Sequence, residues 1–121
     1  MARLRLNFAC GPYDRTQALR DGTIQPDGIE LNYLALQPAE IFWRMLQFKE
    51  FDASEMSLSN YTTLVSEGNS PFIAVPAFPS RVFRHGYFFI NTSKGITSGA
   101  DLKGKRGGVP EYSMKIGRAH V

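Results

Sequence analysis

The densest group of residues that could do chemistry lies between Pro76 and His85, in the stretch PAFPSRVFRH. Arg81 and Arg84 supply two guanidinium groups, and His85 can give or take a proton near neutral pH. Apolar runs on both sides, PFIAV and GYFFI, predict strands that would hold this stretch in place. Charged side chains in a proline-shaped loop on a rigid scaffold are typical of functional sites, so we favour that role over a solvated loop.

Other candidates also lie just after predicted strands. In a parallel sheet the carboxyl ends of the strands meet at one edge, and ligands bind there. The residues at such positions, besides the arginine stretch, are Tyr13, Asp14, Arg15, Glu55, Ser57, Ser59, Glu111 and Tyr112.

Several of these candidates have a structural explanation as well. A solvated cap at a helix start explains Asp14 and Arg15 equally well, since aspartate favours that position. Glu55 follows small and apolar residues, so it is either a buried carboxylate or, as we favour, a surface one. Ser57 and Ser59 are first of all helix caps, although a helix start also offers free N–H groups to an anion.

The elements that must position these residues alternate between strand and helix. Apolar periodicity and turn residues predict strands over residues 4–10, 28–36, 51–57, 71–78 and 86–92, with a further turn and strand within 101–112. Helices are predicted over residues 14–22, 38–51 and 57–68. The second has Pro38 at its first position and Ile41, Phe42, Met45 and Leu46 on one face. Alternating units of this length predict an α/β fold with a mostly parallel sheet and helices on its faces.

Composition excludes several classes of function. The 121 residues are 43% hydrophobic and 21% charged, as in an ordinary globular protein, and the net charge of +3 is spread along the chain. Without a basic block we expect no nucleic-acid partner. Cys10 is the only cysteine, which excludes an intrachain disulfide and predicts a small apolar residue at a strand end. The start of the sequence has no secretory signal and no run is long enough to cross a membrane, so we expect a cytoplasmic protein.

The last seven residues, KIGRAHV, follow no capping, packing or strand pattern. Written as the codons AAG ATC GGA AGA GCA CAC GTC, they run through a widely used sequencing adapter. We therefore hypothesise that residues 115–121 are a non-native tail and that the gene continues past Met114. Without the tail, His85 is the only histidine.

Three segments carry a resemblance to a known family. EIFWRMLQFKEFDASEMSLSNY, SPFIAVPAFPSRVFRHGYFFINTSKGI and DLKGKRGGVPEY resemble the amino-terminal part of the 4,5-dihydroxyphthalate decarboxylase family, which is similar in fold to type II periplasmic solute-binding proteins. The resemblance covers nearly all of residues 4–112, and Gly107 departs from the pattern, where a β-branched residue is expected. It implies a truncated two-lobed α/β molecule, with residues 1–95 as the first segment of lobe I and 96–114 as the start of lobe II.

The resemblance also implies an activity, the decarboxylation of 4,5-dihydroxyphthalate to 3,4-dihydroxybenzoate in aromatic catabolism. Arg81 and Arg84 are our candidates for holding the two adjacent carboxylates, because guanidinium groups match carboxylates in a bidentate way. His85 is the candidate proton donor. Glu55 or Asp14 would orient His85 or accept hydrogen bonds from the ring hydroxyls. The fragment alone should be inactive, and nothing in these residues demands a metal or another cofactor.

The alternative function is a substrate-binding protein of an ABC transporter for a small organic anion, with the same cleft and no chemistry. The absence of a signal peptide speaks against it. An enzyme of the same fold that acts on another small carboxylate is a third interpretation. In each case the expected partner is a small carboxylate, with neither nucleic acid nor a membrane, and a homo-oligomer of the full-length protein is compatible with the sequence.

Overall fold

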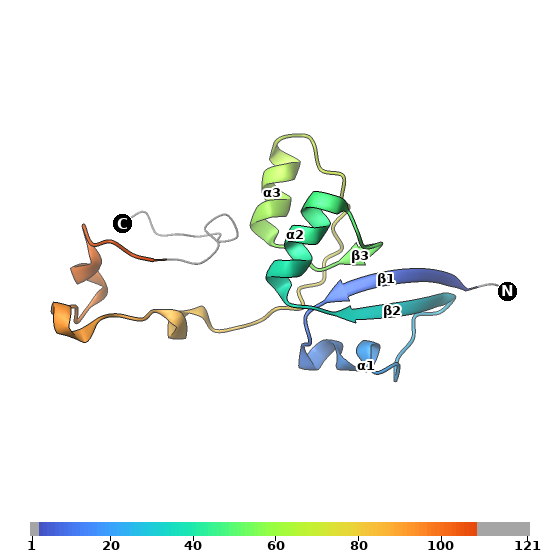
Figure 1. Ribbon diagram of the computed structural model, residues 1–121, viewed down its shortest axis with the longest axis horizontal. Helices are drawn as coiled ribbons and strands as arrows, with labels where there is room; N and C mark the ends of the chain where they lie inside the picture. Colours follow the sequence, from blue (N-terminus) through green and yellow to red (C-terminus); the bar gives the residue numbers. More distant parts are fainter. Residues whose placement is uncertain (1–2, 109–121) are drawn as a thin grey trace. The chain divides into compact units, whose positions relative to one another are not determined.

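A computed structural model of the chain describes residues 3–108 (Figure 1). The chain divides into two units, Met1–Arg81 and Val82–Val121. The boundary predicted between lobes at residues 95 and 96 stays a prediction, and the proposed tail lies outside the described residues. No helix within residues 3–108 has the length and apolar character needed to cross a membrane.

The first unit is built on a parallel sheet with the strand order β2-β1-β3. β1 (Leu4–Cys10) pairs with β2 (Ile29–Ala35) along its whole length, from Leu4 opposite Ile29 to Cys10 opposite Ala35. β3 (Ala53–Ser54) adds a short third strand beside Phe8 and Ala9, within the longer range that the sequence predicts. The α/β class with a parallel sheet is therefore confirmed in this part, while the two-lobed periplasmic-binding-protein-like arrangement stays a prediction.

Three helices follow the strands, as the sequence predicts. A 3-10 turn (Asp14–Thr16) leads into the short α1 (Gln17–Arg20), and α2 (Pro38–Phe48) and α3 (Leu58–Ser66) are the longer ones. Pro38 lies in the first turn of α2, where its missing N–H costs no hydrogen bond. Figure 1 shows α1 and α2 on opposite sides of β1 and β2.

The core lies where α2 packs on the sheet. Ile41 and Met45, one helical turn apart, are buried together with Ala9 of β1 and Phe51, and Phe42 packs against this cluster. The predicted apolar face of α2 is confirmed. Trp43 of the same helix is 56% exposed, and its ring packs nearly perpendicular to that of Phe48, with the two ring centroids 5.1 Å apart.

The strands predicted over residues 71–78 and 86–92 are wrong. Residues 71–83 have no regular structure, and residues 82–108 of the second unit contain only 3-10 helices, Arg84–Tyr87, Thr92–Lys94 and Gly99–Leu102. Pro71 and Pro76 lack the N–H that a ladder needs, and a strand forms only beside a neighbour that completes its hydrogen bonds. The apolar side chains remain exposed, Ile73 by 95% and Phe89 by 89%. The last predicted strand reaches residues 109–112, outside the described part.

Candidate active site

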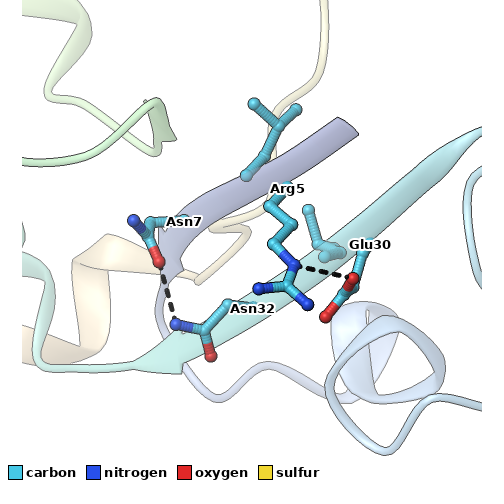
Figure 2. Close-up of a pocket in the computed structure, with 6 residues that line it drawn as sticks. Arg5, Asn7, Glu30 and Asn32 are labelled. Carbon is cyan, nitrogen blue, oxygen red and sulfur yellow. Dashed lines mark hydrogen bonds and ion pairs between the residues drawn. The ribbon is translucent and has the colours of Figure 1, made fainter. Parts of the chain in front are cut away.

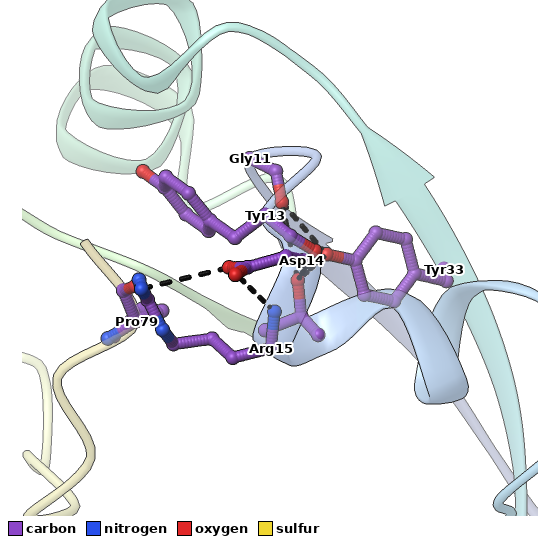
Figure 3. Close-up of polar contacts among 7 residues, drawn as sticks. Gly11, Tyr13, Asp14, Arg15, Tyr33 and Pro79 are labelled. Carbon is purple, nitrogen blue, oxygen red and sulfur yellow. Dashed lines mark hydrogen bonds and ion pairs between the residues drawn. The ribbon is translucent and has the colours of Figure 1, made fainter. Parts of the chain in front are cut away.

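The candidate site forms at the carboxyl edge of the sheet, where β1 ends at Cys10 and β3 ends at Ser54. The chain continues from β1 through Gly11 to Tyr13 and from β3 directly into Glu55. Figure 3 shows the segment after β1 together with Tyr33 of β2 and Pro79 of the later loop. This is the edge at which ligands bind in open α/β sheets.

Glu55 is the buried acid of this edge, with 8% of its surface exposed. The backbone N–H of Gly11 donates to Glu55 Oε1 at 2.6 Å, and the Tyr13 hydroxyl donates to Oε2 at 2.9 Å. The favoured prediction of a surface carboxylate is therefore wrong. The parallel pairing of β3 with β1 continues through a hydrogen bond from Glu55 N to Ala9 O at 3.0 Å, and this pairing brings the carboxylate beside two donors.

Tyr13 lies against Gly11 and is fixed at both its ring and its hydroxyl. A Cβ on Gly11 would come within 2.8 Å of the Tyr13 ring and 3.0 Å of Glu55 Oε1, so only glycine leaves room for this arrangement. Burial, and next the hydrogen bond to Glu55, raise the pKa of Tyr13 to about 12. The phenol therefore keeps its proton at neutral pH.

A second tyrosine, Tyr33 of β2, hydrogen-bonds the segment that follows β1. The Tyr33 hydroxyl lies 2.9 Å from Gly11 O and 3.0 Å from Thr16 Oγ1, and burial raises its pKa to about 12. Cys10 is fully buried at the end of β1, as predicted, and burial raises the pKa of its thiol. Because a raised pKa leaves little thiolate, Cys10 is a packing residue here.

Asp14 and Arg15 join the segment after β1 to the loop of residues 76–81. The Arg15 guanidinium donates to Pro79 O at 2.5 Å and forms an ion pair with Asp14 Oδ1 at 3.5 Å (Figure 3). The Asp14 carboxylate also accepts the Arg15 backbone N–H at 2.8 Å. These contacts give the pair a structural task at the helix start, and a role in substrate binding stays a prediction.

Ser57 and Ser59 lie at the start of α3. Ser57 occupies the N-cap position, as predicted, but its side chain makes no capping hydrogen bond. Its Oγ lies 2.8 Å from Ser59 Oγ instead. With 8% exposure, Ser57 is as buried as Glu55, whereas Ser59 is half-buried.

The remaining predicted residues have no contact described with the groups at this edge, or they lie outside the described residues. Arg81 is exposed and is the last residue of the first unit. Arg84 and His85 begin a 3-10 helix of the second unit, so their roles stay predictions. Glu111 and Tyr112 lie outside the described residues. The sequence flagged Tyr13 by its position after a strand but assigned it no role.

A pocket of about 470 Å³ lies elsewhere, over the amino-terminal half of β1 and β2 (Figure 2). Paired side chains occupy its wall: Arg5 Nε lies 3.0 Å from Glu30 Oε2, and Asn32 Nδ2 donates to Asn7 Oδ1 at 2.9 Å. These polar groups bind one another across directly paired strand positions. Within residues 3–108, no group of three or more histidine, cysteine, aspartate and glutamate side chains is arranged to hold a metal ion.

A parallel α/β fold with a buried carboxylate and a phenol at the carboxyl edge of its sheet is typical of proteins that bind small organic ligands. No protein-family model matches the chain. Over 114 residues, or 94% of its length, the chain is 47% identical to proteins named 4,5-dihydroxyphthalate decarboxylase from Comamonas testosteroni and Pseudomonas putida. The predicted resemblance to 4,5-dihydroxyphthalate decarboxylases is thereby confirmed. The chain spans 34% and 44% of the length of these two relatives.

Proposed function

We propose that the protein to which this chain belongs converts 4,5-dihydroxyphthalate to 3,4-dihydroxybenzoate and carbon dioxide. The observation that carries the proposal is the 47% identity over 94% of the chain to two proteins that bear this name. The polar groups at the carboxyl edge of the sheet support it, because a dihydroxylated aromatic acid needs hydrogen-bonding partners as well as cations. Neither relative is named as a solute-binding protein, and no observation favours the transporter alternative.

The chemistry proceeds in two balanced steps. First, an acid transfers a proton to the ring carbon that bears one carboxylate, and the hydroxyl para to this carbon supplies electron density that stabilises the protonated ring. Second, the bond between that carbon and the carboxylate breaks, its electron pair restores the aromatic ring, and carbon dioxide leaves. The proton remains on the ring carbon, and the donor regains a proton from water.

The chain's residues supply the groups that these steps require. In this scheme Arg81 and Arg84 bind the two carboxylates of the substrate, and His85 donates the proton. The carboxylate of Glu55 acts at the end of the ring that carries the hydroxyls. The scheme also assigns substrate binding to Asp14, Arg15, Ser57, Ser59, Glu111 and Tyr112, the last two of which lie outside the described residues.

The proposal is tested by incubating the complete protein with 4,5-dihydroxyphthalate. Equimolar release of carbon dioxide and 3,4-dihydroxybenzoate, followed by gas analysis and chromatography, is the expected result. Phthalate is the matched control: it has both carboxylates but no para hydroxyl, so it should bind without reacting. A folded protein that binds 4,5-dihydroxyphthalate and leaves it unchanged would refute the assignment.

A further inference from the structure

We propose that Tyr13 recognises a ring hydroxyl of the substrate by accepting its hydrogen bond, while the phenol proton of Tyr13 is donated to Glu55. The inference rests on the proposed function, because it assumes a dihydroxylated ring as the ligand. It gives a role to Tyr13, which the steps above do not use. Glu55 then acts through Tyr13 as a positioning residue.

The first step of the argument is that the phenol is held in one orientation. Its ring lies over Gly11, where a Cβ would come within 2.8 Å of the ring atoms. Its hydroxyl is 2.9 Å from Glu55 Oε2, and Glu55 is itself fixed by the Gly11 N–H at 2.6 Å from Oε1. Because both donors point at the same buried carboxylate, the direction of the Tyr13 proton is set.

The second step concerns what the phenol can still offer. A tyrosine hydroxyl has one proton and two acceptor lone pairs. At neutral pH Tyr13 keeps its proton and donates it in the hydrogen bond to Glu55. The Tyr13 oxygen can therefore only accept a hydrogen bond from a ligand. It therefore suits a donor such as a ring hydroxyl, and it repels the carboxylate end of the same molecule.

The third step is that a hydroxyl can reach this oxygen. Tyr13 is half-buried rather than enclosed, unlike Glu55. The side chain of Ser80 also hydrogen-bonds Tyr13. Because the single phenol proton is donated to Glu55, the Ser80 hydroxyl must be the donor in this second hydrogen bond. Ser80 is exposed and belongs to the loop that leads to Arg81. The exposed Ser80 hydroxyl thus already donates to the Tyr13 oxygen, which is the acceptor that we assign to the substrate hydroxyl.

This arrangement bears on reactivity as well as on selectivity. A ring hydroxyl that donates to Tyr13 gains electron density on its oxygen and passes it to the para carbon, which is the carbon to be protonated. A ligand without the hydroxyl makes no hydrogen bond to the Tyr13 oxygen and gains no binding free energy there. Tyr13 therefore selects the hydroxylated ring at the step where the hydroxyl matters chemically.

The test compares two unreactive ligands on the complete protein. The affinities of 3,4-dihydroxybenzoate and benzoate are measured by titration calorimetry, and their ratio reports recognition of the hydroxyls. In Tyr13→Phe we expect this ratio to fall about ten-fold, because one hydrogen bond to the ligand is lost and benzoate binding is untouched. Tyr33→Phe is the matched control: it removes a hydroxyl 2.9 Å from Gly11 O without touching Glu55, and the ratio should not change.

A second variant keeps the phenol and changes only its partner. In Glu55→Gln the Gly11 N–H still requires an acceptor at the Oε1 position, so the amide NH₂ takes the place of Oε2 and donates to the Tyr13 oxygen. The lone pair that the substrate needs is then occupied, and we expect the ratio to fall again, about five-fold or more. A merely structural role of Glu55 would lower the melting temperature and leave the ratio unchanged.

The outcomes separate this inference from the proposed function. If the wild-type protein releases carbon dioxide from 4,5-dihydroxyphthalate but Tyr13→Phe and Glu55→Gln keep the wild-type affinity ratio, the role of Tyr13 is refuted and the function stands. If Tyr13→Phe does not fold, the ratio in Glu55→Gln decides alone. A wild-type protein that neither binds 3,4-dihydroxybenzoate nor releases carbon dioxide overturns both.

Discussion

Arg81 and Arg84 would bind the substrate through geometry as much as through charge. If each holds a carboxylate with its guanidinium fork, replacing either with lysine keeps the charge and loses the second hydrogen bond. We expect the binding of 4,5-dihydroxyphthalate to weaken by about 1.5–3 kcal/mol in each variant, with little change in melting temperature. Arg5→Lys, at an exposed position on the sheet, is the control and should bind as the wild type does. Unchanged affinity in both loop variants would contradict the assignment.

His85 has a distinct expected signature because it acts on the reacting carbon rather than on the carboxylates. Replacing it with glutamine keeps a polar side chain and removes the titrating proton. We expect the turnover rate to fall roughly 100-fold or more while substrate affinity stays nearly the same. Single-turnover kinetics and equilibrium binding measure the two quantities separately. A folded His85→Gln protein with full activity would remove His85 from the mechanism.

Gly11 tests the packing of the candidate site itself. In Gly11→Ala the new methyl group would come within 2.8 Å of the Tyr13 ring. The methyl group can be accommodated only if Tyr13 or the backbone moves. We expect a loss of about 1–3 kcal/mol in the free energy of unfolding, together with weaker binding of hydroxylated ligands. Gly99→Ala, where the added atom meets nothing within 4 Å, is the control and should change neither. Denaturant titration gives the stabilities.

At the scale of elements, α2 divides into a buried and an exposed face. Ile41 is fully buried against Ala9 of β1, whereas Trp43 is 56% exposed. Ile41→Ala should therefore cost about 2–5 kcal/mol in the free energy of unfolding, through lost burial and the cavity left behind. Trp43→Ala should cost about 1 kcal/mol or less, the value of its aromatic contact with Phe48. Equal losses in the two variants would contradict the packing described here.

The elements that the sequence predicts correctly are those whose signal is local. The alternation in residues 4–10 and the turn before residue 28 define β1 and β2, and Pro38 with Ile41 and Met45 defines α2. Residues 71–78 and 86–92 contain apolar runs of strand length but form no strand, because a strand also needs a partner that no local pattern reveals.

The candidate site shows the same limit at longer range. The burial of Glu55 depends on Gly11 and Tyr13, which are 44 and 42 residues away in the sequence. No local pattern distinguishes it from a surface carboxylate. The sequence does predict that the site lies at the carboxyl edge of the sheet, because Asp14, Arg15, Glu55 and the two serines all follow strands. Parallel pairing then brings the ends of β1 and β3 together.

At the scale of the whole molecule, several large apolar side chains within residues 71–90 are mostly exposed. Ile73, Val75, Phe83 and Phe89 are between 73% and 95% exposed, and the two relatives are more than twice as long as the chain. Large apolar side chains exposed to this degree mark surfaces that other protein segments cover. We infer that parts of the longer protein pack on residues 71–81 of the first unit and on residues 82–90 of the second.

This gives a prediction for the chain on its own. Residues 1–121 expressed alone should aggregate or form a loosely packed state that binds a hydrophobic dye, and they should release no carbon dioxide from 4,5-dihydroxyphthalate. Size-exclusion chromatography, dye fluorescence and thermal melting measure the state. Replacing Ile73 and Phe89 with serine should reduce aggregation and dye binding, whereas Leu4→Ser, at an exposed site on the sheet, should have a smaller effect. A sharp, reversible melt together with measurable decarboxylation by the isolated chain would refute the prediction. The isolated chain would then fold and react without any further segment to cover its apolar surface or complete its site.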